Sequence, residues 1–154
     1  MAVSDAGVEA VHVASTTWTQ RQDSARMLYD DERKAADTMR GDAHQQAALD
    51  IEQAITKLGD PAANPALGRS IIELYWGASF HWLAYGCDRK HGKHKETHDK
   101  LGKFLRDIGE PAMAARWDAL DNDRRGGWYG HHASLTDVAD AHDGWEGIRL
   151  WATS

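Results

Sequence analysis

One segment, residues 67–87, constrains the fold more than any other, because it is apolar around nearly its whole circumference. Its hydrophobic residues recur at helical spacing on two faces, Leu67, Ile71, Leu74, Ala78, Trp82 and Tyr85 on one and Ile72, Trp76, Phe80, Leu83 and Cys87 on the other. A helix that is hydrophobic on all sides is buried among other helices. Arg69, Glu73 and His81 interrupt the run, which favours a core helix over a membrane span. The segment therefore predicts the central helix of a bundle.

Further helical patterns flank this segment, and no alternating strand pattern occurs in the sequence. The expected helices are, in chain order, residues 17–40, 43–58, 67–87, from near His94 to Ile108, one that begins at Pro111 and one that follows Ser134. Gly41 and Asp42 are expected to separate the first two, with Asp42 as an N-cap. The expected inner faces of the last two are Met113, Trp117 and Leu120, and Leu135, Val138, His142, Trp145 and Ile148. The expected fold is all-α, an up-and-down bundle of five to six helices.

Length and composition indicate an ordinary globular domain with an acidic surface. Residues 1–15 show no clear helical period, which predicts a flexible N-terminal arm, and the length of 154 residues predicts one domain over residues 16–154. The net charge of −6 excludes a protein that coats nucleic acid through bulk positive charge, but leaves room for a small basic site. A single cysteine, Cys87, and the lack of a secretory signal pattern indicate the cytoplasm and no membrane partner.

The helical phase of the segment after Pro111 singles out an arginine and a histidine. Arg124 lies seven residues after Trp117, and His131 lies seven residues further on. If the helix continues through the Gly126–Gly127 pair, both side chains project the same way, about 10 Å apart, and together they could hold a phosphate and move a proton. Arg125, Tyr129 and His132 flank them. The alternative is a helix that ends at Arg124–Arg125, where the macrodipole favours cations.

Three short motifs follow one another between Glu73 and Gly130. They are Leu74-Tyr75-Trp76-Gly77-Ala78-Ser79-Phe80-His81 in the apolar helix, Thr97-His98 at the expected start of the next helix, and Arg124 followed by Tyr129 and Gly130. This ordered set resembles the HEPN domain, a small helical domain of prokaryotic toxin–antitoxin, CRISPR and other defence systems. Many members of that family are ribonucleases in which an arginine is followed a few residues later by a histidine.

The resemblance implies a role for each candidate residue. Arg124 would hold the scissile phosphate, and His131 would act as general base or acid for attack by the neighbouring 2′-hydroxyl, without a metal ion or cofactor. The residues expected to bind the RNA around them are Arg125, Tyr129 and His132. The implied protein is a homodimeric endoribonuclease or RNA-binding component of a toxin–antitoxin or defence system, with an antitoxin partner. Because Trp128 stands where the family has aspartate, a non-catalytic module that pairs with a nucleotidyltransferase-type partner is the alternative.

A metal-binding bundle is a third interpretation of the sequence. His91, His94 and His98 follow helical spacing and could bind Zn²⁺ on one helix face, completed by His81, Glu73 or His142. Gly92 interrupts this run, and the neighbouring Lys90, Lys93 and Lys95 would repel a cation. The prediction for this segment is therefore that it holds no metal ion.

Overall fold

Helices packed side by side account for the fold of the computed structural model, which describes residues 40–129 and 133–154. They are a helix over residues 40–58, the 3-10 turn η1 (Pro65–Leu67), α2 (Gly68–His91), α3 (Leu101–Asp107), α4 (Pro111–Tyr129) and α5 (Leu135–Thr153). No strand occurs in these two ranges, so the expected all-α helical bundle is confirmed. No helix in them is long and apolar enough to cross a membrane.

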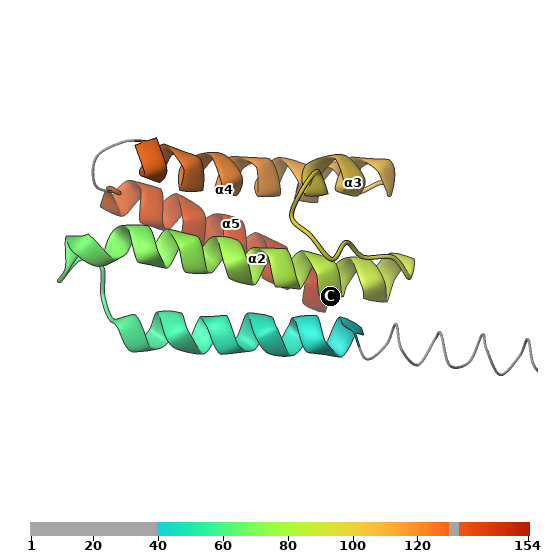
Figure 1. The fold of residues 1–154 in the computed structure, drawn as a ribbon, viewed down its shortest axis with the longest axis horizontal. Coiled ribbons are helices and arrows are strands. Elements are labelled where there is room, and N and C mark those ends of the chain that lie inside the picture. The colour runs from blue at the N-terminus through green and yellow to red at the C-terminus, as the bar shows by residue number, and fades with distance from the viewer. Residues whose placement is uncertain (1–39, 130–132) are drawn as a thin grey trace, which may run out of the picture. The chain divides into compact units, whose positions relative to one another are not determined.

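The central helix is α2, as its all-round apolar surface predicts. It runs through the middle of the bundle, with the 40–58 helix on one side and α4 and α5 on the other (Figure 1). Leu83 and Cys87 are fully buried in the core. Helix α2 continues beyond the expected end at Cys87 to His91, where Gly92 adopts a left-handed backbone with φ of 61° and caps it. Burial raises the pKa of Cys87 to about 12, so its thiol is not a nucleophile at neutral pH.

The expected helix break at Gly41 and Asp42 is wrong, because the described helix is continuous from residue 40 to residue 58. Gly41 instead permits a close approach to α2. A Cβ atom at this position would lie 2.7 Å from Oδ2 of Asp88. Residues 38–154 group into one unit of the chain. The predicted arm over residues 1–15 and the helix over residues 17–39 lie outside the described residues.

The segment between α2 and α3 is not helical from His94 onward, contrary to the prediction. Helix α3 begins only at Leu101, after Lys100 has adopted a left-handed backbone with φ of 54°. The expected helical face of His91, His94 and His98 is therefore wrong. Nε2 of His91 lies 2.9 Å from Glu110, Nδ1 of His94 lies 3.3 Å from Asp88, and the His98 ring lies 5.0 Å from the Trp76 ring.

Helix α5 begins with the predicted capping box. The backbone N–H of Asp137 donates to Oγ of Ser134 at 3.1 Å, and that of Ser134 donates to the Asp137 carboxylate at 2.8 Å. Val138 and Ile148 are buried as expected, whereas Leu135 is 53% exposed, contrary to the prediction. The start of α5 faces Gly68 of α2 through Val138 and Ala133 instead.

Candidate functional site

Helix α4 continues through the Gly126–Gly127 pair, where the sequence could have ended it. It runs from Pro111 to Tyr129, so the alternative of a helix that ends at Arg124–Arg125 is wrong. The phase of the inner face therefore holds through Arg124, since Trp117 and Leu120 are buried against the core. The Arg124 side chain consequently points toward α2, and only 25% of it is exposed.

Three groups fix the guanidinium of Arg124. Its Nε donates to Oε2 of Glu73 on α2 at 3.0 Å, and its Nη1 donates to Oδ1 of Asp121 at 3.4 Å. The guanidinium carbon also lies 4.0 Å from the centre of the Trp76 ring, within the range of a cation–π contact. A guanidinium held on both edges and one face is oriented before any ligand arrives.

Asp121 connects Trp76, Arg124 and Arg125 where α4 packs against α2. Its carboxylate accepts a hydrogen bond from the indole Nε1–H of Trp76 at 3.1 Å and forms ion pairs with both Arg124 and Arg125. The Asp121 side chain is 13% exposed, whereas that of Arg125 is 67% exposed. One largely buried carboxylate is thus shared by two arginines, and Glu73 provides the second carboxylate that pairs with Arg124.

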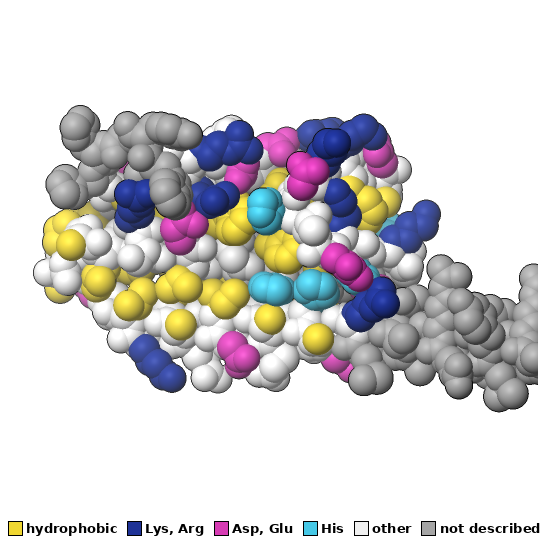
Figure 2. Space-filling view, viewed as in Figure 1, with side chains coloured by type: hydrophobic (Ala, Val, Ile, Leu, Met, Phe, Trp, Pro, Cys, Tyr) yellow, Lys and Arg dark blue, Asp and Glu magenta, His cyan; other side chains and the backbone are white. Residues whose placement is uncertain are grey.

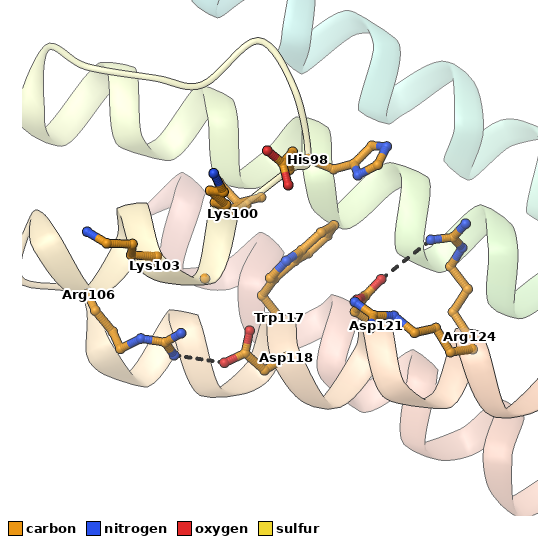
Figure 3. Close-up of a pocket in the computed structure, with 12 residues that line it drawn as sticks. His98, Lys100, Lys103, Arg106, Trp117, Asp118, Asp121 and Arg124 are labelled. Carbon is orange, nitrogen blue, oxygen red and sulfur yellow. Dashed lines mark hydrogen bonds and ion pairs between the residues drawn. The ribbon is translucent and has the colours of Figure 1, made fainter.

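A pocket of about 390 Å³ opens beside Arg124, between α4 and the start of α3 (Figure 3). Five of its described lining residues are cationic, namely Lys100, Lys103, Arg106, Arg124 and Arg125, and three are carboxylates, namely Asp99, Asp118 and Asp121. Arg106 is paired with Asp118 at 2.7 Å, and Lys103 is paired with Asp107 at 2.6 Å. The five cations and three carboxylates of the lining leave an excess of two formal positive charges, and Asp107 and Glu73, which are outside the lining, pair with Lys103 and Arg124.

Aromatic rings form the inner wall of this site. Trp117 is 4% exposed and lies between the core and the pocket (Figure 3). The Trp76 ring lies 5.3 Å from the Trp117 ring and 5.0 Å from the ring of His98, which is at the pocket's surface. These rings support the pocket from the core side, because Trp117 is almost fully buried and the Arg124 guanidinium already lies over the Trp76 ring.

The remaining predicted site residues lie at or beyond the end of α4. Tyr129 is the last residue of that helix. Its side chain, and all of His131 and His132, lie outside the described residues. Their expected position beside Arg124 stays a prediction.

Sequence reasoning missed several groups that build this site. Asp121 precedes Arg124 and Arg125 by three and four residues, a spacing typical of helical ion pairs, so a sequence signal was present. Lys103 and Arg106 of α3 carried no such signal, because their place in the pocket depends on how α3 packs against α4.

Comparisons with protein-family models, with curated proteins and with solved structures found no match to this chain. The described residues define a helical bundle with an arginine-containing cationic pocket. Its geometry is the basis for assigning a function.

A second polar cluster lies where the 40–58 helix meets α2. Nδ1 of His44 lies 2.9 Å from Nδ1 of His81, and the His44 ring lies 5.3 Å from the ring of His94. Burial is the main cause that lowers the pKa of His44, with His81 and His94 adding to it and Asp88 and Glu96 opposing it. Burial also lowers the pKa of His81. Both imidazoles are therefore neutral at neutral pH.

This cluster predicts that the protein loses stability on mild acidification. The unfolded chain protonates these histidines near pH 6.5, while the folded state resists protonation. We expect the free energy of unfolding, measured by urea denaturation, to decrease as the pH falls through 6.5 and toward the lower pKa values of the folded state. His44→Gln should make this dependence shallower than in the wild type. An equal dependence in the two proteins would contradict the prediction.

Proposed function

We propose that this protein binds RNA at the pocket between α3 and α4 and cleaves it without a metal ion. The observation that carries the proposal is the oriented guanidinium of Arg124, held at 3.0 Å by Glu73 and stacked on Trp76 at the edge of a cationic pocket. The resemblance to HEPN domains adds support, because Arg124 is the residue that matches the arginine of that family's ribonucleases.

Arg124 keeps donors for a phosphate although it is already paired. A guanidinium carries five N–H donors. The hydrogen bond to Glu73 uses the one on Nε, and the hydrogen bond to Asp121 uses one of the two on Nη1. The remaining N–H groups can form the parallel hydrogen bonds by which arginine recognises phosphate oxygens. Lys100 and Lys103 line the same pocket and can contact neighbouring phosphates of the strand.

The proposed reaction is a transfer within the RNA strand. His131 takes the proton of a 2′-hydroxyl, and the 2′-oxygen attacks the adjacent phosphorus. The bond to the 5′-oxygen breaks, and that oxygen receives the proton from His131, which returns the imidazole to its neutral form. The products are a 2′,3′-cyclic phosphate and a 5′-hydroxyl, so no water or metal ion is consumed. Arg124 stabilises the charge that develops on the phosphate oxygens. We also propose that the protein is a homodimer in which two such sites face one groove. Light scattering of the purified protein tests whether it is a dimer.

The test of this function compares arginine variants on RNA. With purified protein in excess chelator, Arg124→Ala should slow cleavage of a single-stranded RNA by about 10²–10³-fold, the typical effect of losing a charge-stabilising donor. Arg124→Lys should restore only part of the rate, because lysine lacks the planar fork. The matched control is Arg89→Ala, which removes an exposed arginine that donates to the Ala152 carbonyl and does not line the pocket.

The outcomes separate the site from general charge effects. Cleavage that is equally slow in Arg124→Ala and Arg89→Ala would contradict the proposal, as would wild-type protein that neither binds nor cleaves RNA. His131→Ala should abolish cleavage while leaving RNA binding in place. Thermal denaturation of each variant shows whether its loss of activity reflects unfolding.

A non-catalytic interaction module is the second candidate. The observation in its favour is that Arg124 already has two carboxylate partners, Glu73 and Asp121, which offset its charge. In that case the arginine stabilises the packing of α2 against α4, and a partner such as a nucleotidyltransferase-type protein binds elsewhere on the surface. Arg124→Ala would then lower the melting temperature, and the wild-type protein would show no affinity for RNA.

A further inference from the structure

Three histidines from three separate segments meet at the seam between the 40–58 helix and α2. His44 comes from the first helix, His81 from α2 and His94 from the segment that follows α2. The ring of His44 lies 5.2 Å from that of His81 and 5.3 Å from that of His94. Figure 2 shows histidine side chains gathered along this seam, at the surface of the molecule. The cluster shares no residue with the pocket beside Arg124.

A carboxylate orients the third of these imidazoles. Oδ1 of Asp88 lies 3.3 Å from Nδ1 of His94, and their side chains are only 12% and 7% exposed. An imidazole that donates its Nδ1–H to a carboxylate presents the lone pair of Nε2, which is the arrangement found behind many metal-binding histidines. Gly41 leaves room for this carboxylate, since a Cβ there would lie 2.7 Å from its Oδ2.

We propose that His44, His81 and His94 form a binding site for Zn²⁺. Two imidazole nitrogens bound to one tetrahedral zinc ion, each at about 2.0–2.1 Å, lie roughly 3.3 Å apart. The Nδ1 atoms of His44 and His81 are 2.9 Å apart, so a small outward movement of either ring admits the ion between them. The ring that donates its Nδ1–H in this contact changes tautomer when the ion binds, so that its proton stands on Nε2 and both Nδ1 lone pairs face the ion; no net proton is released.

The third ligand is reached by a side-chain rotation. Among the described residues, the only trio whose ligand atoms already lie within 4.8 Å of one another is His142, Asp143 and Glu146 on α5. Zinc binding by the three histidines therefore requires the His94 ring to move toward His44 and His81 while its Nδ1 keeps its contact with Asp88. Three imidazoles leave the fourth position of a tetrahedral ion open to water.

Two carboxylates favour a cation at this seam, whereas Lys93 and Lys95, which neighbour His94 in the sequence, oppose it. Asp88 and Glu96 are the carboxylates that face His44. Arg40 is paired with Glu96 at 3.4 Å through a side chain that is 55% exposed.

The test is a titration of the purified full-length chain with zinc. We expect isothermal titration calorimetry to show one Zn²⁺ per chain for the wild type, and Co²⁺ to give the visible absorption of a tetrahedral site. His44→Ala and His81→Ala should each weaken zinc binding by at least about 10-fold. Asp88→Asn should weaken it by about 10–100-fold, as is typical for loss of a carboxylate behind a ligating histidine.

The matched control is His142→Ala, which removes the histidine of the exposed α5 trio. It should bind zinc as the wild type does. Failure of the wild type to bind zinc would overturn the proposal, as would binding that survives both His44→Ala and His81→Ala or that is lost in His142→Ala. Circular dichroism of each variant establishes that it is folded before the titration is read.

Discussion

Replacement of Trp117 by alanine is expected to lower the free energy of unfolding by about 3–5 kcal/mol, the usual effect of truncating a buried aromatic residue. Trp117 is 4% exposed, and its ring packs against those of Trp76 at 5.3 Å and Phe80 at 6.5 Å. The same side chain forms a wall of the pocket. The substitution therefore leaves a cavity where the core meets the candidate site.

Urea denaturation followed by far-ultraviolet circular dichroism measures this loss. Trp117→Phe is the conservative control, because it keeps an aromatic ring against Trp76 and should lose much less stability than the alanine variant. A loss below about 0.5 kcal/mol for Trp117→Ala, which is typical of surface positions, would contradict the burial of this residue.

The second large effect is expected at Gly86, where α2 and α5 approach closely. A Cβ atom at Gly86 would lie 2.4 Å from Cζ3 of Trp151 and 3.0 Å from Cα of Ala152. The backbone at Ala152 cannot move without displacing α5, so Gly86→Ala should destabilise the protein by about 1–3 kcal/mol through overpacking. The melting temperature should fall accordingly.

Gly126 provides the matched control, because it is also a helical glycine but a Cβ atom added there would meet no neighbouring atom within 4 Å. Gly126→Ala should be neutral or stabilise α4 by about 0.4–1 kcal/mol. Thermal denaturation of the two variants side by side tests the contrast. A loss of equal size at both positions would show that helix packing at Gly86 is looser than these distances indicate.

The helices could be predicted from the sequence where one signal dominated. The apolar circumference of residues 67–87 identified α2, and Ser134 with Asp137 identified the start of α5. Glycine was a weaker guide, because the same residue serves different purposes. Gly92 ends a helix, whereas Gly41 lies within one and makes room for Asp88.

The candidate site was predictable along one helix but not between helices. The spacing from Trp117 to Arg124 correctly placed the arginine on the inner side of α4. Its partner Glu73 is 51 residues away in sequence, and His44 is 37 residues from His81. Such pairs depend on which helix faces which, and this information is not carried by local periodicity.

The nine residues that join α2 to α3 place two histidine side chains against two different residues of α2. The segment begins at Gly92 and ends at Lys100, both left-handed, and between them His94 reaches Asp88 while His98 reaches Trp76. Surface connections commonly tolerate insertions and deletions. Here one extra residue would displace either His94 or His98, so the length of this connection is a constrained property of the chain.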